Sequence, residues 1–348
     1  MTGDIRDILA KSDAARSLRL EKRVAESFRT NHWPASRGVY YQDAETGKQR
    51  EIDVYSRHLL DSPRKYEGIG APIINMEIFC ECKSLHNSNI ILSPDDIGEK
   101  SRISVSNYWV GREGELAGVV DRLSNEYRLS KHRDIRTLYD HVVGRAYPDD
   151  GRALLAPSHV TAPPVEVVAT AFRETKGGRE SAEQGKISPA WGAVRACLSA
   201  VDGGLARARI LSLDYVHASL PPFTRESERV DQTSFFLDAE LTRSTYLHPF
   251  VVLGAKLWVL RDAEVSEVKS ARIIVSGIES GDRYVDIVNE DHLDQYMSDM
   301  TSHFEAASKS HIERLWDHIE EVGWFPGADS INLRAALGIL EETDKSSS

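Results

Sequence analysis

The chain has 348 residues and a formal net charge of −11, from 43 Lys and Arg against 54 Asp and Glu. A hydrophobic content of 41% is enough for a sizeable core and argues against global disorder. No stretch approaches the roughly 20 apolar residues that a membrane helix requires. The charged first residues lack the apolar run of a signal peptide, so we expect a cytoplasmic protein without membrane association.

The acidity belongs to the C-terminal quarter of the chain. Residues 262–348 contain 7 Lys and Arg against 19 Asp and Glu, whereas the residues before them contain 36 and 35. The larger part of the chain is therefore close to neutral. An acidic total does not exclude a polyanionic ligand for that part.

The first ninety residues predict a helix followed by three strands. Apolar residues recur at spacings of three and four over the first thirty residues, and this helix should end before Pro34. Two short strands, Gly38–Gln42 and Arg50–Ser56, are joined by a polar turn that contains glycine. The most strand-like run is Ile73–Lys83, in which one face carries Met76, Ile78, Cys80 and Cys82 and the other carries Glu77, Phe79, Glu81 and Lys83.

The remaining sequence is less regular. The segment from about residue 84 to 160 is mixed and is interpreted as inserted, with helical candidates at 116–127 and 135–143. Residues 163–172 fit either a helix begun by proline or a strand, and periodicity does not decide between them. The later segments predict, in order, a helix at 191–201, strands at 208–215 and 249–260, a hairpin at 271–288, and amphipathic helices from 293 and from 312.

Helices flanking a mixed sheet are the simplest architecture with this order of elements, so the predicted fold class is α/β. We expect the chain to divide into four parts. These are the first part of a core at 1–90, an insertion at 91–185, the rest of the sheet with acidic C-terminal helices at 186–330, and a tail at 331–348.

The residues that indicate chemistry are Asp53, Glu81 and Lys83. The tripeptide Glu-x-Lys alone is weak evidence because it occurs three times, at 81–83, 174–176 and 267–269. Only the first ends a long apolar strand, and only the first follows a strand in which an acidic residue is flanked by aliphatic ones, at 52–54. Charged side chains in apolar strands are costly unless they are paired or bind a metal, which favours a site over simple packing.

A helix with Glu21, a strand with Asp53 and a strand with Glu81 and Lys83, in this order, resembles the PD-(D/E)xK, or restriction-endonuclease-like, nuclease superfamily. The resemblance covers roughly residues 15–90, with Ile52 in place of the proline of the name. It implies a restriction-endonuclease-like core with a large insertion and a helical C-terminal part. It also implies that Asp53 and Glu81 bind a metal ion, that Lys83 is the catalytic lysine, and that Glu21 is the acidic residue of the first helix.

The reaction that this resemblance implies is Mg²⁺- or Mn²⁺-dependent hydrolysis of phosphodiester bonds by an endonuclease, with DNA as the expected substrate. Two carboxylates supply hard oxygen ligands for such an ion, which lowers the pKa of bound water. A lysine beside them can orient or help to deprotonate that water and can neutralise phosphate oxygens. The resemblance suggests a role in antiviral defence, against foreign DNA, or in DNA processing.

Each of these residues also has a structural interpretation. Glu21 is compatible with a solvated position on a charged helix. Asp53 could be a charge that protects an edge strand from aggregation. Glu81 and Lys83 could form an exposed ion pair. The other acidic residues on the same strand faces are expected to be auxiliary or structural: Glu51 and Glu77.

The cysteines are interpreted as structural. Strand alternation directs Cys80 and Cys82 into the same apolar layer, and no second pair of Cys or His has zinc spacing. Together with Cys197 they are too few and too irregularly spaced for a disulfide framework, which agrees with a reducing compartment.

Partners are less determined. Residues 112–145 carry seven Lys and Arg among six acidic residues, which fits either an arm that contacts DNA phosphates or a solvated surface of mixed charge. The acidic C-terminal helices should face away from DNA, contact a basic protein partner or shield the site. The alternatives to a nuclease are a non-catalytic nuclease-fold subunit that binds or assembles within a larger complex, and an enzyme of another class. Oligomerisation is left open.

Overall fold

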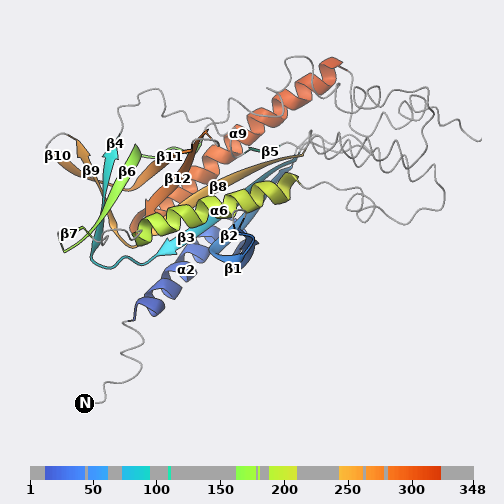
Figure 1. Ribbon diagram of the computed structural model, residues 1–348. Coiled ribbons are helices and arrows are strands. Elements are labelled where there is room, and N and C mark those ends of the chain that lie inside the picture. Colours follow the sequence, from blue (N-terminus) through green and yellow to red (C-terminus); the bar gives the residue numbers. More distant parts are fainter. Residues whose placement is uncertain are drawn as a thin grey trace, which may run out of the picture.

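The computed structural model describes residues 12–43, 46–61, 73–94, 109–110, 162–177, 179–180, 188–209, 243–261, 264–277 and 281–322. Within these ranges, three long helices pack on one mixed sheet of twelve strands (Figure 1). The fold class is therefore mixed α/β, as the sequence predicts. Among the described helices, none has the length and apolar character to span a bilayer.

The sheet combines antiparallel and parallel neighbours. Its strands are β1 Ala35–Gln42, β2 Gln49–Asp61, β3 Ile73–Lys83, β4 Ser88–Pro94, β5 Trp109–Val110, β6 Val167–Lys176, β7 Arg179–Glu180, β8 Arg243–Leu253, β9 Lys256–Arg261, β10 Glu264–Val268, β11 Ser270–Gly277 and β12 Gly281–Asn289. The order is β1-β2-β3-β8-β12-β11-β6-β4-β9-β10, with β5 beside β8 and β7 beside β6. The parallel pairs are β3 with β8, β8 with β12, β11 with β6 and β4 with β9.

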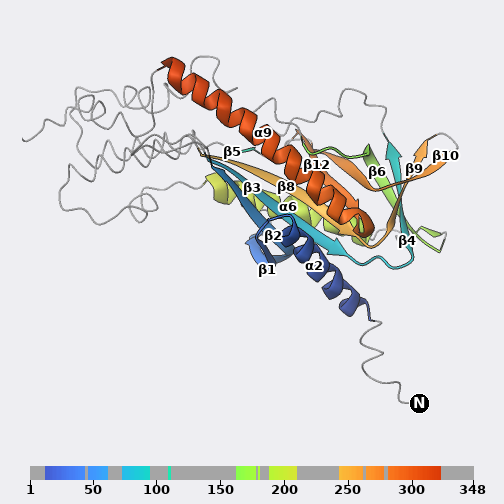
Figure 2. The ribbon, with the colours of Figure 1, turned by 180° about the vertical axis from the view of Figure 1, so that it is seen from behind.

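Helices cover both faces of the sheet. Helices α2 (Asp13–Thr30) and α9 (Leu293–Val322) share one face, and α6 (Pro189–Arg209) lies on the opposite face (Figure 1, Figure 2). Two hydrogen bonds tie the N-terminal elements to α9: Ser27 donates to Asp294, and Trp33 donates to Thr301 at 2.8 Å. A short 3₁₀ helix, η3 (Glu290–His292), leads into α9.

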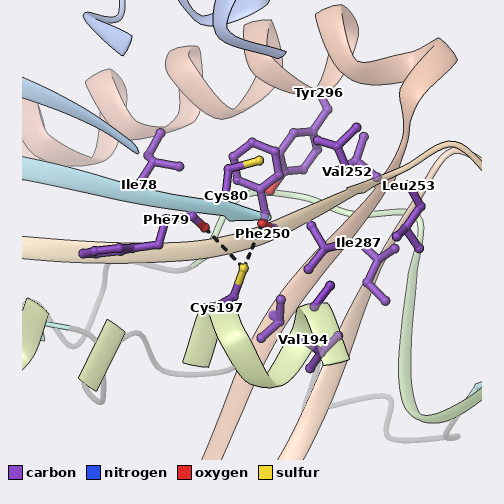
Figure 3. Packing of buried hydrophobic residues seen from close by; sticks show 14 of the residues in the cluster. Ile78, Phe79, Cys80, Val194, Cys197, Phe250, Val252, Leu253, Ile287 and Tyr296 are labelled. Atoms are coloured by element: carbon purple, nitrogen blue, oxygen red, sulfur yellow. Dashed lines mark hydrogen bonds between the residues drawn. The ribbon is translucent and has the colours of Figure 1, made fainter. Parts of the chain in front are cut away.

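Helix α6 approaches the sheet closely because its inner face carries small residues. A Cβ atom on Gly204 would lie 2.5 Å from the Leu247 side chain and 2.7 Å from that of Phe79. Cys197 Sγ lies 3.6 Å from the Phe79 carbonyl oxygen and 3.2 Å from that of Phe250, between β3 and β8 (Figure 3). Burial raises the pKa of the Cys197 thiol, so the side chain stays neutral and packs as a small apolar group. All three cysteines are buried and free, which confirms their structural interpretation.

Most elements predicted in the first ninety residues are confirmed. The N-terminal helix begins at Asp13, where the Ser12 side chain accepts from the Ala15 N–H at 3.1 Å, and it ends before Pro34. The predicted strand Ile73–Lys83 is β3. Further along the chain, the predicted hairpin at 271–288 is formed by β11 and β12, and the segment at 163–172 leads into a strand, β6.

Two expectations are wrong in part. Ala208 and Arg209 continue α6 instead of opening a strand, since both residue types favour helices. The strand expected at 249–260 is broken at Gly254, whose N–H donates to the Lys83 carbonyl at 2.9 Å, and so becomes β8 and β9. Within the segment 91–185, β6 belongs to the sheet, where it pairs with β4 and β11. The helical candidates at 116–127 and 135–143 and the tail at 331–348 lie outside the described residues.

A buried polar network joins α9 to the sheet. Arg272 forms a bidentate ion pair with Asp286, at 2.7 and 2.8 Å, and both side chains are buried. Tyr296 of α9 donates to Asp286 and accepts from His248 Nε2, each at 2.8 Å. Burial lowers the pKa of His248 to about 4, although the Asp286 charge opposes this, so the imidazole is neutral at pH 7.

Replacement of Asp286 by Asn should lower the free energy of unfolding by about 3–5 kcal/mol, because the Arg272 guanidinium would stay buried without a counter-charge. Urea unfolding at neutral pH measures this loss. The matched control is Glu267→Gln, which removes the carboxylate of the exposed Lys256–Glu267 pair and should cost less than about 1 kcal/mol. Equal losses in the two variants would contradict the role given to the buried pair.

Candidate active site

The candidate site lies where β2 separates from β3. The paired register of these two strands ends at Val54 and Cys80, whereas β3 continues beside β8 to its last residue, Lys83. Beyond this point the Cys82 N–H donates to Asp53 Oδ2 at 2.7 Å. A side-chain carboxylate thus takes the place of a backbone acceptor at the fork between the strands. This hydrogen bond fixes the position of Asp53 relative to β3.

The edge strand β1 adapts to the fork through Gly38. The register pairs on either side place Gly38 opposite Asp53. Its φ of +64° is in the left-handed region, and a Cβ atom there would lie 2.9 Å from Glu51 Oε1. Glycine therefore lets the strand pass the Glu51 side chain. Sequence reasoning missed this residue, although a glycine inside a strand pattern is a recognised sign of a bulge or close approach.

Asp53, Glu81 and Lys83 converge at this fork. Lys83 Nζ lies 2.8 Å from Glu81 Oε2 and 3.4 Å from Asp53 Oδ2. Glu81 is buried, whereas the side chains of Lys83 and Asp53 are 34% and 20% exposed. The interpretation of Glu81 and Lys83 as an exposed ion pair is therefore wrong. The edge-strand interpretation of Asp53 is also wrong, since β2 lies between β1 and β3.

Burial and a neighbouring carboxylate raise the affinity of Glu81 for a proton. Burial raises the pKa of Glu81, the nearby Asp53 charge raises it further, and Lys83 opposes both only in part, so the pKa is about 7. For Lys83, burial alone would lower the pKa. The charges of Glu81 and Asp53 outweigh burial and raise it, which keeps the ammonium protonated at neutral pH.

Glu21 of α2 lies within electrostatic reach of the same residues. Burial raises its pKa first, and the charge of Asp53 adds to this. Arg37 and then Lys83 act in the opposite direction, while Glu51 raises it. The structure therefore brings the four predicted residues into one region, with Glu21 on its border. Glu77 instead accepts from Arg207 of α6 at 2.6 Å, in agreement with a structural role.

The other two Glu-x-Lys tripeptides have structural explanations. Glu174 is buried and accepts from the Ala190 N–H at 3.2 Å, so it caps the N-terminal end of α6. Glu267 pairs with Lys256 on the exposed hairpin of β9 and β10, at 3.0 Å. Glu81, in contrast, pairs with the lysine of its own tripeptide, and that lysine also contacts a second carboxylate, Asp53.

The residues at the fork fit a small divalent cation in type and number. Among the described residues, no group of three or more His, Cys, Asp or Glu side chains is arranged to hold a metal. Mg²⁺ is commonly bound by one or two carboxylates together with water and substrate phosphate oxygens, and Asp53 and Glu81 supply two. A cation would also offset the repulsion that raises the pKa of Glu81.

Comparison of the chain with family models, with curated proteins and with solved structures finds no match. The chemistry of the fork is therefore what indicates a function. The arginines and lysines expected to contact DNA between 112 and 145 lie outside the described residues.

The pKa of Glu81 predicts a pH-dependent cost of folding. Between its ordinary pKa of 4.5 and about 7, the folded chain keeps a proton that the unfolded chain has lost. Unfolding then releases a proton, so stability should fall as the pH rises through this window, by on the order of 3 kcal/mol. Glu81→Gln should remove this loss. Its stability relative to wild type should rise by that amount across the window, as measured by urea unfolding in EDTA.

The exposed Glu267→Gln variant is the control for this measurement, because its stability relative to wild type should change little with pH. A difference between wild type and Glu81→Gln that stays constant from pH 4.5 to above 7 would show that Glu81 is not protonated in the folded state.

Proposed function

We propose that this chain is a metal-dependent nuclease with a restriction-endonuclease-like core, which hydrolyses phosphodiester bonds in DNA. The observation that carries the proposal is the meeting of Asp53, Glu81 and Lys83 at the fork between β2 and β3, with Glu21 on its border. The order of α2, β1, β2 and β3 agrees with the core that the sequence resemblance implies.

Asp53 and Glu81 are the residues that would hold the cation, which when bound lowers the pKa of a coordinated water and screens phosphate charge. The hydrogen bond from the Cys82 N–H holds Asp53 in place relative to β3. Since Lys83 stays protonated at neutral pH, it can donate hydrogen bonds to the attacking water or to a phosphate oxygen. Its role is to orient the attacking water and to neutralise the negative charge that develops on the phosphate. A protonated Lys83 does not accept a proton from that water.

Replacement of Lys83 by Ala should reduce DNA cleavage in Mg²⁺ by about 100-fold or more, because the positive charge at the scissile phosphate is lost. Cleavage of linear, circular and single-stranded DNA, and of RNA, measures the effect and identifies the substrate. Lys176→Ala is the matched control, since Lys176 belongs to the Glu-x-Lys of β6 and is exposed. Equal activity of wild type and Lys83→Ala, or cleavage that survives EDTA, would contradict the mechanism.

Mg²⁺ or Mn²⁺ should raise the thermal unfolding midpoint of the wild-type protein, because a ligand of the folded state stabilises by about 2.7 kcal/mol at 100 times its dissociation constant. Asp53→Asn should lose most of this rise, while Asp299→Asn on the exposed side of α9 should keep it. A rise of the same size in Asp53→Asn would place the cation elsewhere. Metal and DNA binding without cleavage would indicate a non-catalytic nuclease-fold subunit.

A further inference from the structure

Helix α2 and strand β1 carry a concentration of positive charge in an acidic protein. Residues 14–42 contain six Lys and Arg but only two acidic residues, Glu21 and Glu26, whereas the chain as a whole has a net charge of −11. These are the same elements that border the candidate site. The charge is therefore located where a polyanionic substrate would have to approach.

Four exposed side chains form what we call the α2–β1 basic surface: Arg19, Lys22, Arg29 and Arg37. Arg37 precedes Gly38, which lies opposite Asp53, and its charge opposes the rise in the pKa of Glu21 that burial causes. Lys22 follows Glu21 directly on α2, and Arg29 donates to the Ala35 carbonyl at 3.1 Å, which ties the helix to β1. The surface thus extends from the exposed side of α2 to the edge of the fork.

The opposite flank of α2 is electrostatically different. Arg23 lies 3.9 Å from Asp291, in the acidic turn that leads into α9. Its charge also acts on Glu290, whose pKa burial raises and Arg23 lowers. Asp291 therefore partly offsets the charge on the α9 side of the helix. On the β1 side Lys22 pairs with Glu26 at 3.6 Å, but the four basic side chains still outnumber Glu21 and Glu26. On the basic side, Leu18 of α2 and Tyr40 of β1 are 58% and 65% exposed, so no element within the described residues covers them.

We propose that the α2–β1 basic surface binds the phosphate backbone of duplex DNA and leads it to Asp53, Glu81 and Lys83. This inference rests on the proposed nuclease function and specifies where the substrate lies. Contacts of this kind position the duplex and carry no sequence information, which agrees with four basic side chains and no base-reading motif among them.

Binding can be measured without cleavage, with full-length protein in EDTA and a fluorescein-labelled DNA duplex, by anisotropy over a series of salt concentrations. The test variant combines Arg19→Gln, Lys22→Gln and Arg37→Gln. The control removes the same charge at the far edge of the sheet, through Lys256→Gln, Arg261→Gln and Lys269→Gln. Loss of three phosphate contacts should reduce the slope of log affinity against log salt by about 2.7, so that binding weakens most at low salt, while the control stays near wild type.

Equal weakening in both triple variants would show that only net charge matters and would overturn the proposed surface, as would unchanged binding in the test variant. Tighter binding of a matched RNA duplex than of DNA would overturn DNA as the ligand. Different outcomes contradict the proposed nuclease activity and the proposed DNA-binding surface. Loss of binding in the test variant without metal-dependent cleavage by wild type would contradict the nuclease and keep the surface, whereas cleavage that the test variant retains in full would contradict only the surface.

Discussion

The hydrogen bond from the Cys82 N–H to the Asp53 carboxylate is the interaction on which the candidate site depends. In an unbroken antiparallel ladder, this N–H would bond to a backbone carbonyl of β2. Because a side chain accepts it instead, β2 can diverge from β3 while the N–H remains satisfied. The divergence opens the position where the Lys83 amine meets both carboxylates. The divergence of β2 from β3 is thus what forms the candidate site.

Two buried carboxylates in this protein show opposite solutions to the cost of burying charge. Asp286 is fully enclosed, with a bidentate arginine and a tyrosine as donors, so its charge is neutralised and closed to solvent. Glu81 shares one partly exposed lysine with a second carboxylate, and its pKa is raised to about 7. The first arrangement stabilises the docking of α9. In the second, Lys83 offsets the repulsion between the two carboxylates only in part, and perturbed pKa values of this kind cluster at functional sites.

The sequence predicts the parts of the site that are local along the chain. Alternation in Ile73–Lys83 locates β3 and the shared face of Glu81 and Lys83, because a strand repeats every two residues. The fork was not predictable, since it depends on the register between β2 and β3. The role of Glu174 was hidden for the same reason: the N–H that it caps is sixteen residues away in sequence. The break at Gly254 follows from a contact with Lys83, on a strand distant in sequence.

The parallel pairing of β3 with β8 extends without interruption from Ile73 to Lys83. Since neighbouring residues of a strand point to opposite faces, one residue inserted upstream of Cys80 within β3 would exchange the two faces from that point on. The charged pair would then enter the layer that holds Cys80 and Cys82, and two thiols would face the fork. Insertions or deletions in the connection between β2 and β3 therefore leave the alternation at the site unchanged. Within β3, only insertions or deletions of an even number of residues keep Glu81 and Lys83 on their present face.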